Sequence, residues 1–218
     1  MEKFTRLSGA AAPLMRRNVD TDVISPMARI VAEPHDTLGR WAFEPWRYLA
    51  DGSENPEFVL NREPFRGAPI LIVGPNFGCG SSREMAVWGI AQMGFRSVIG
   101  SSFGDIFHTN CFKNGVLPVR LPEATVEELA EQAAGGNARF TVDLEAQVVI
   151  DARGREIPFQ VGRNEREMLL AGLDEIGMTL RHLPALDAFQ SADRQARPWV
   201  YAVEEVEFKA EQDESLKL

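Results

Sequence analysis

The sequence is poor in the residues that build disulfide frameworks and metal clusters. Its 218 residues include only two cysteines, Cys79 and Cys111, and three histidines. Two cysteines do not form a disulfide framework, and they suit a reducing compartment. A cubane iron–sulfur cluster normally needs three or four cysteines, so we do not expect this chain to hold one alone. His108 and Cys111 could share a helix face, but two ligands do not complete a zinc site, and we interpret them as packing residues.

Long apolar runs and an excess of positive charge are also missing. No stretch approaches the roughly 18 apolar residues of a membrane span, and the first residues lack the apolar centre of a signal peptide. The net charge is −9 and the isoelectric point is near 5.0, which argues against nonspecific nucleic-acid binding. The hydrophobic fraction of 44% is ordinary for a globular core. We therefore expect a cytoplasmic protein with no nucleic-acid or membrane partner.

The most informative segment is a glycine-rich loop at residues 74–84, with the sequence GPNFGCGSSRE. It follows the apolar run 69–73, which indicates a buried strand, and precedes 85–93, which indicates a helix with an apolar face. Backbone N–H groups at a junction of this kind point outward unpaired, and the helix dipole adds partial positive charge. We therefore expect an anion to bind there.

Other interpretations of this loop were compared with anion binding. A dinucleotide-binding turn needs a third glycine where Arg83 stands, and a P-loop needs a lysine that the segment lacks. A nucleophile elbow needs a second glycine after the serine, which neither Ser81 nor Ser82 has. A tight turn whose serines cap the next helix remains an open alternative for an isolated Gly-Ser-Ser.

Beyond this loop the chain alternates strands and helices, which predicts a parallel sheet with right-handed crossovers. The predicted β-α-β-α-β series consists of residues 70–73, 83–93, 97–100, 105–113 and 116–120. We then predict a helix, three short antiparallel strands and two further helices, at 122–134, 140–143, 147–151, 156–160, 165–170 and 173–181.

Two polar loops should meet at one edge of this sheet. Open α/β sheets place their sites at the carboxyl ends of parallel strands, and residues 74–84 and 100–107 follow adjacent predicted strands. Residues 12–26 are polar and turn-rich, with side chains that can bind nearby backbone. Residues 28–66 are irregular and rich in aromatics. Such a segment is either a loop fixed to the body by its aromatics or a substrate-facing flap, and both alternatives stay open.

Several blocks of sequence occur together in a fixed order. They are NVDTD at 18–22, GCGSSRE at 78–84, SFGDIF at 102–107, NCFKNGVLP at 110–118, FTVDLEAQ at 140–147 and GLDEIGMTL at 172–180. Over about residues 12–192 the chain closely resembles the small subunits of 3-isopropylmalate dehydratase, the swivelling-domain component of the aconitase superfamily. The resemblance implies a single domain over 1–218, ending in an acidic tail at about 203–218. The implied fold is a swivelling β/β/α domain with a parallel core sheet, flanking helices and a small antiparallel sheet.

The resemblance also implies an activity that needs a partner. A hydro-lyase of this family interconverts 2-isopropylmalate and 3-isopropylmalate through 2-isopropylmaleate, in leucine biosynthesis. A large subunit is expected to carry a [4Fe–4S] cluster and to form a heterodimer or heterotetramer with this chain, which binds no cofactor itself. Two alternatives remain open. One is a related hydro-lyase for citraconate, maleate or another alkylmalate, and the other is a non-catalytic carboxylate-binding domain.

Catalytic roles follow residue by residue from the resemblance. Ser81 is expected to be the base, acting as an alkoxide, with N–H donors of the 78–82 turn and the helix dipole stabilising its charge. Arg83 is expected to bind a substrate carboxylate through its planar fork. Asp22 matches an acidic residue that orients the arginines or the hydroxyl. The substrate-binding residues are expected to be Gly80, Ser82 and Arg83, and Glu84 is given no catalytic role.

Substrate choice is expected to depend on residues 28–45. Candidates for an apolar wall are Met27, Ile30, Val31, Leu38 and Trp41. We interpret Arg29 and Arg40 as solvated surface arginines rather than carboxylate ligands.

The chain departs from the usual family pattern at three places beside the expected site. Met85 stands where the family usually has histidine, Val87 stands where proline is common, and Gly-Ser-Ser-Phe-Gly at 100–104 replaces Ala-Pro-Ser-Phe-Ala. Ser81 and Arg83 are intact, so dehydratase chemistry is still expected. The departures leave the choice of diacid substrate open.

Overall fold

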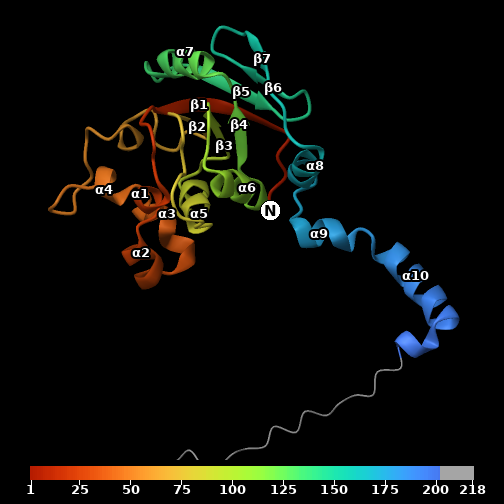
Figure 1. The fold of residues 1–218 in the computed structure, drawn as a ribbon. Coiled ribbons are helices and arrows are strands. Elements are labelled where there is room, and N and C mark those ends of the chain that lie inside the picture. Colours follow the sequence, from red (N-terminus) through yellow and green to blue (C-terminus); the bar gives the residue numbers. More distant parts are fainter. Residues whose placement is uncertain (202–218) are drawn as a thin grey trace, which may run out of the picture. The chain divides into compact units, whose positions relative to one another are not determined.

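A computed structural model describes residues 1–201 of the chain, which divides into two units, Met1–Ile176 and Gly177–Leu218. The first unit is built on one seven-stranded mixed sheet in the order β4-β3-β2-β1-β5-β6-β7 (Figure 1). Its strands are β1 (Arg6–Leu14), β2 (Ile70–Val73), β3 (Ser97–Gly100), β4 (Leu117–Arg120), β5 (Arg139–Asp143), β6 (Val148–Ile150) and β7 (Glu156–Pro158). The predicted α/β class, with a parallel core sheet, antiparallel strands and flanking helices, is confirmed.

The central strand β1 is not among the strands predicted from the sequence. Its residues, RLSGAAAPL, are mostly small and have weak strand propensity. β1 forms because both of its edges are paired: its second half runs parallel to β2, and its first half runs antiparallel to β5. The predicted small antiparallel sheet is therefore continuous with the parallel core through β1.

Helices cover both faces of the parallel strands, which explains their continuous apolar sequences. Leu71 and Val73 of β2 face one cluster, packed under α5 (Met85–Gln92) and α6 (Asp105–Lys113). Ile70 and Ile72 face the other cluster, which includes side chains of α7 (Glu123–Ala133). Figure 1 shows α7 on one side of the sheet and α5 and α6 on the other. The predicted strands and helices of this region are confirmed, with ends shifted by one or two residues.

The last elements are helical. The two helices predicted after the third antiparallel strand are found as α8 (Arg163–Ala171) and α9 (Glu175–Leu180). The second unit also contains α10 (Leu183–Ala196), which the sequence interpretation does not include, and a short turn of 3₁₀ helix at Pro198–Val200. A single domain over the whole chain stays a prediction. The predicted acidic tail at about 203–218 lies outside the described residues.

The segment predicted as irregular consists of short helical turns. They are α1 (Thr21–Ile24), α2 (Met27–Ala32), α3 (Leu38–Trp41) and α4 (Glu44–Arg47), with 3₁₀ turns at His35–Thr37 and Val59–Asn61. Phe43, Phe58 and Phe65 are buried in the core beneath them. Aromatic side chains therefore do fix much of this segment to the body, as the first of the two alternatives requires.

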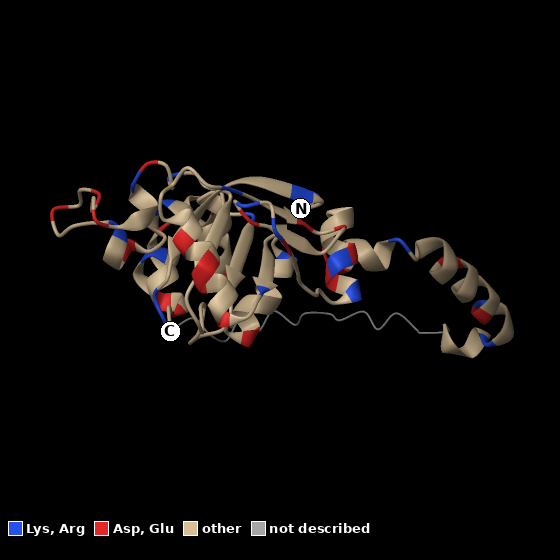
Figure 2. Cartoon of the chain, turned by 90° about the horizontal axis from the view of Figure 1, so that it is seen from above, with Lys and Arg blue, Asp and Glu red and all other residues tan. Residues whose placement is uncertain are grey.

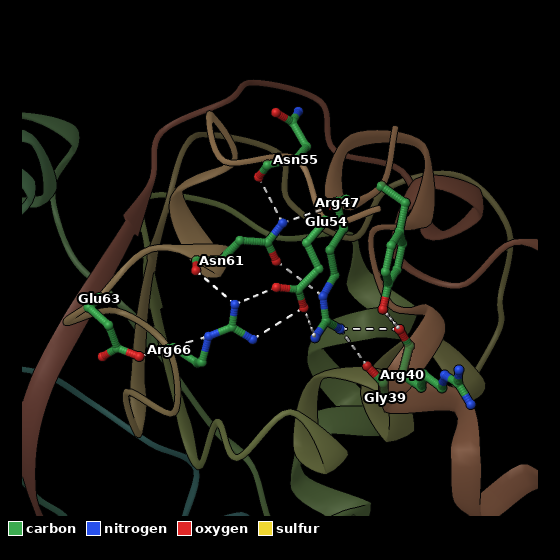
Figure 3. A network of polar contacts seen from close by, with 9 residues as sticks. Gly39, Arg40, Arg47, Glu54, Asn55, Asn61, Glu63 and Arg66 are labelled. Atoms are coloured by element: carbon green, nitrogen blue, oxygen red, sulfur yellow. Dashed lines mark hydrogen bonds and ion pairs between the residues drawn. The ribbon is translucent and has the colours of Figure 1, made fainter. Parts of the chain in front are cut away.

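Polar contacts fix the same segment from within (Figure 3). Asn61 donates through Nδ2 to the carbonyl oxygens of Arg47 at 2.7 Å and Asn55 at 2.9 Å. Arg66 forms an ion pair of 2.5 Å with Glu54 and also donates to the carbonyl of Asn61. Because buried backbone carbonyls need partners, this network holds the 47–66 stretch in one conformation. A substrate-facing role for residues 28–45 stays a prediction.

Candidate functional site

Three loops meet at the carboxyl ends of the parallel strands. The loop after β2 donates from Gly78 N to the carbonyl of Val19, at 2.7 Å, in the loop after β1. It also donates from Asn76 N to Ser102 Oγ, at 2.8 Å, in the loop after β3. The prediction that the loops after β2 and β3 meet at one edge of the sheet is confirmed. The structure adds the loop after β1, which brings Thr21 to Ser81 and Asp22 to Arg83.

Glycines shape the turn that carries the serines. Gly78 has φ +70° and Gly80 has φ +90°, conformations that side-chain-bearing residues rarely adopt. A Cβ on Gly78 would overlap the ring of Phe107, and a Cβ on Gly104 would overlap the carbonyl of Gly78. The turn is therefore held between α6 and the loop after β3, and it presents Ser81 and Ser82 outward, where both are exposed.

Gly78→Ala should destabilise the free chain by about 2–4 kcal/mol, because it adds a left-handed backbone cost to a steric overlap. The measurement is urea unfolding followed by circular dichroism. Gly67→Ala is the matched control, since Gly67 has φ +73° but nothing within 4 Å of its Cβ position. Only the backbone cost of about 1 kcal/mol should appear there. Equal losses in the two variants would show that Phe107 does not confine the turn.

Ser81 is held by a residue that lies sixty positions away in the sequence. Thr21 Oγ1 lies 3.0 Å from Ser81 Oγ and donates to the carbonyl oxygen of Ser81 at 3.1 Å. Thr21 is itself 1% exposed, and it sits in α1, which packs beside α5 (Figure 1). The sequence predicts for Thr21 only a side chain that can bind nearby backbone, with no role in the site. The signal in the sequence that could have pointed to Thr21 is its position between Asp20 and Asp22 in the NVDTD block.

Asp22 contacts the arginine rather than the proposed base. Its Oδ1 accepts a hydrogen bond from Arg83 Nη1, and the two side chains form an ion pair. The Arg83 side chain is 17% exposed and the Asp22 side chain 59%, so the pair contributes little to stability. Among the described residues, the other N–H groups of Arg83 have no hydrogen-bond partner. The carboxylate therefore fixes one arm of the guanidinium and leaves the rest for an anion.

The backbone donors at the turn differ in part from those expected. Gly78 N donates to Val19, so it is not available to an oxyanion. In the part of the chain that the structure describes, the N–H groups of Gly80, Ser81 and Ser82 donate no hydrogen bond. α5 begins at Met85, and its first turn has no side-chain cap. The alternative in which the serines only cap that helix is therefore wrong.

Glu84 has a structural partner. Its Oε1 accepts a hydrogen bond of 2.8 Å from Asn114 Nδ2, and Asn114 Oδ1 accepts one of 2.9 Å from Trp88 Nε1. Asn114 is also the C-cap of α6. The network ties the end of α6 to the start of α5, directly behind the turn, and it leaves Glu84 facing the helix rather than the serines.

The arginine predicted to be solvated in α2 is instead engaged. Arg29 Nε donates to Glu44 Oε2 at 2.9 Å, and its guanidinium lies 3.6 Å from the ring centroid of Trp41. The hydrogen bond to Glu44 raises the pKa of Arg29. Arg29 is a surface arginine whose side chain is 31% exposed, but it is paired with Glu44 and Trp41 rather than freely solvated. Arg40, by contrast, is exposed.

The apolar wall candidates separate by burial. Leu38 is 1% exposed and packs into the core, so it cannot line an open pocket. Val31 is 80% exposed and Met27 is 46% exposed, both on α2. Ile30 and Trp41 are partly buried. A wall built by the exposed residues of α2 stays a prediction.

The thiols and the nearby imidazole pack against other side chains. His108 lies 5.8 Å from the ring of Phe103 and 5.2 Å from that of Phe112, and burial lowers its pKa. Burial raises the pKa of Cys111 well above its ordinary value, and burial followed by the charge of Asp20 raises that of Cys79. The packing role of His108 and Cys111 is confirmed. Protonated thiols are poor ligands, and the described residues contain no group of three or more metal-ligating side chains.

The surface carries charges of both signs. Figure 2 shows basic residues interspersed with acidic ones rather than gathered on one face of the view. No helix among residues 1–201 is long and apolar enough to cross a membrane.

Comparison with known proteins identifies the class first. A family model of the aconitase C-terminal domain matches residues 1–124, and the LeuD_N model matches residues 127–162. The first of these covers the sheet edge with the serine turn. A solved structure of 3-isopropylmalate dehydratase (leuD) from Methanocaldococcus jannaschii has the same fold, with a TM-score of 0.61 and 24% identity over 84% of this chain and 99% of that one.

Curated relatives then define the family. The 3-isopropylmalate dehydratase small subunit of Gluconacetobacter diazotrophicus is 52% identical over 91% of this chain and 97% of its own length. The small subunit of Cereibacter sphaeroides strain KD131 is 49% identical over 92% of this chain and all of its own length. The chain belongs to the family of 3-isopropylmalate dehydratase small subunits, and its membership implies a large-subunit partner.

Proposed function

We propose that this chain is the small subunit of a heteromeric 3-isopropylmalate dehydratase that works in leucine biosynthesis. It pairs with a large subunit in a heterodimer or heterotetramer and acts in the cytoplasm on small dicarboxylates. The observation that carries the proposal is one arrangement. An exposed serine, Ser81, is hydrogen-bonded to a buried threonine and followed by an arginine, Arg83, on a glycine turn with free N–H groups.

Ser81 is the proposed base. The reaction removes a proton from the carbon beside a carboxylate, and this proton is weakly acidic. A serine hydroxyl is far too basic to ionise in water unaided, so its anion needs donors placed around it. The N–H groups of Gly80, Ser81 and Ser82 are unpaired in the described structure, and the positive end of the α5 dipole follows them. These groups are suited to stabilise negative charge at the turn.

Arg83 is the proposed carboxylate ligand. Asp22 holds its Nη1 group, so the remaining N–H groups keep one orientation and can form two parallel bonds to a carboxylate. Ser82 and Gly80 lie on the same exposed turn and are proposed to complete the substrate contacts through hydroxyl and backbone groups. Asp22 accordingly orients the arginine rather than the base.

The family's iron–sulfur cluster is proposed to lie in the large subunit. This chain does not fit the cluster, because its two cysteines have raised pKa values and one of them is fully buried. When bound to the large subunit, the [4Fe–4S] cluster would supply Lewis-acid chemistry toward the leaving hydroxyl. The contribution of the present chain is to remove the proton and to hold the substrate.

A related hydro-lyase for a smaller diacid is the second candidate. It is favoured by the departures beside the turn, where Met85 begins α5 and is only partly buried. Gly104 also packs so closely against Gly78 that a Cβ would not fit without movement. The remaining alternative, a non-catalytic carboxylate-binding domain, would not need a base. A serine hydroxyl held by a buried threonine therefore does not favour it.

The test is an anaerobic hydratase assay of this chain co-expressed with the large subunit from the same genome. Ultraviolet absorbance follows consumption of the unsaturated diacid, and 2-isopropylmaleate is compared with citraconate and maleate. The proposal expects kcat/KM to be highest for 2-isopropylmaleate and expects no activity from this chain alone. Preference for citraconate or maleate would replace the leucine-pathway function with the second candidate, and inactivity of the assembled complex on all three would reject both.

A further inference from the structure

Both hydrogen-bond contacts that the structure shows for the Thr21 hydroxyl are with Ser81. Its Oγ1 makes two contacts, one with the side-chain oxygen of Ser81 at 3.0 Å and one with the carbonyl oxygen of the same residue at 3.1 Å. At 1% exposure, Thr21 is one of the few buried polar residues of the chain. A buried hydroxyl needs a partner, but a bond to backbone alone would satisfy it. The second contact, to an exposed side chain, has no such structural explanation.

The backbone around Thr21 is fixed on both sides. Thr21 N donates to the carbonyl of Cys79 at 2.9 Å, and Ser25 N donates to the carbonyl of Thr21 at 2.9 Å. Asp20 caps α1 by accepting from Val23 N at 2.8 Å. A β-branched side chain on a fixed backbone has few rotamers. The hydroxyl is therefore held in place before any substrate binds.

The backbone at Gly80, rather than space, explains the glycine. A Cβ there would lie 3.4 Å from Asp20 Cβ and 3.7 Å from Thr21 Oγ1, which are ordinary van der Waals contacts. The start of α1 therefore packs directly against the turn. The same glycine has φ +90°, which directs the chain back so that Ser81 faces Thr21.

The hydroxyl hydrogen of Thr21 can point to either of two acceptors, the carbonyl oxygen or the side-chain oxygen of Ser81. When Ser81 is neutral, Thr21 donates to the Ser81 carbonyl, and the Ser81 hydroxyl can donate to Thr21 Oγ1. When the proton of Ser81 has left to solvent, Ser81 Oγ can only accept. Rotation of the Thr21 hydroxyl then turns its hydrogen toward the alkoxide, and the Ser81 carbonyl, on an exposed residue, can bond water. A charge-assisted bond of this kind is roughly twice as strong as a neutral one.

We propose that Thr21 is a positioning residue that holds Ser81 in its reactive rotamer and donates its hydroxyl hydrogen to the Ser81 alkoxide. The proposal rests on the proposed function of Ser81 as base. In the step itself, the C–H bond of the substrate breaks, its proton joins Ser81 Oγ, and the electron pair stays on the substrate carbon. The newly formed Ser81 hydroxyl then donates back to Thr21 Oγ1, which restores the arrangement seen in the structure.

The experiment compares Thr21→Val and Thr21→Ser in the complex with the large subunit, by measuring kcat and KM across pH. Thr21→Val removes the hydroxyl and keeps the branched shape. It should lower kcat by about 10-fold, change KM little, and move the rising limb of kcat to higher pH, because the alkoxide loses a donor. Thr21→Ser keeps the hydroxyl and should restore most of kcat and the original pH profile.

Thr141→Val is the matched control, because Thr141 Oγ1 also lies 2.7 Å from a serine hydroxyl, that of Ser8, at the β1–β5 pairing. It should leave kcat and its pH profile unchanged. Should Thr21→Val fail to fold or associate, Thr21→Ala and Thr21→Ser form a second pair that differs only in the hydroxyl. An unchanged pH profile in Thr21→Val, or in Thr21→Ala relative to Thr21→Ser, would overturn the proposal.

Ser81→Ala separates this proposal from the one on which it rests. If the wild-type complex is active, Ser81→Ala is inactive and Thr21→Val behaves like wild type, only the role of Thr21 is wrong. If Ser81→Ala keeps wild-type turnover, the role of Ser81 as base is wrong and the role of Thr21 falls with it.

Discussion

Replacing Ser81 with alanine should lower kcat of the assembled enzyme by about 1,000-fold or more. A positioned general base contributes about 10²–10⁴-fold, and two nearby hydroxyls are not free to replace Ser81: Thr21 Oγ1 is buried, and Ser102 Oγ accepts a hydrogen bond from Asn76 N. KM should change little, because the base acts on substrate that other groups bind. The measurement is steady-state kinetics of the anaerobic complex with 2-isopropylmaleate.

The same substitution should leave the fold and the subunit association intact. Ser81 is exposed, the turn depends on Gly78 and Gly80, and loss of one exposed hydroxyl changes the free energy of unfolding by about 1 kcal/mol or less. Ser8→Ala, which removes a serine bonded to Thr141, controls for the loss of a serine–threonine bond elsewhere. Wild-type turnover in Ser81→Ala would remove this residue from the mechanism, whereas loss of association would show that the serine belongs to the subunit interface.

Most of the parallel core could be predicted because its signals are local. The four-residue strands Ile70–Val73 and Ser97–Gly100 have apolar centres and are buried throughout, so each strand is recognisable by itself. β1 carries no such signal. Its small residues form a strand only because β2 and β5 pair with it from both sides, and pairing partners about 60 and 130 positions away are not visible in its own sequence.

The same contrast between local signals and distant partners applies to the candidate site. The glycine turn and its serines could be found from composition and spacing within eleven residues. Asp22 is expected there only through the family resemblance, and the pairing of Thr21 with Ser81 is not predicted, because both contacts cross a sequence separation of about sixty residues. The pairing of Arg29 is not predictable for a related reason, because its partner Glu44 belongs to another short helix. Side-chain pairing between loops depends on sheet order, which local patterns do not contain.

Replacing Arg83 with lysine should lower kcat/KM by about 100-fold in the assembled enzyme. Lysine keeps the charge and can still pair with Asp22, but a single ammonium cannot make two parallel bonds to a carboxylate. A hydrogen bond to a charged group is worth about 1.5–3 kcal/mol, which corresponds to about 10- to 100-fold in rate, and misplacement of the substrate relative to Ser81 adds to that loss. The measurement is kcat/KM with saturating large subunit, with kcat and KM resolved separately.

Two further variants distinguish substrate binding from structural support. Arg155 is an exposed arginine in the turn between β6 and β7, and it pairs with Glu128 of α7. Arg155→Lys should leave kcat/KM unchanged. Asp22→Asn removes the charge that holds Arg83 Nη1 but keeps an oxygen acceptor, so the guanidinium stays present and less firmly oriented. Its loss in kcat/KM should be smaller than that of Arg83→Lys. If Arg83→Lys keeps wild-type kcat/KM while Asp22→Asn loses it, activity requires the charge pair that lysine preserves, and Arg83 then acts by fixing the loop of Asp22 rather than by binding a carboxylate.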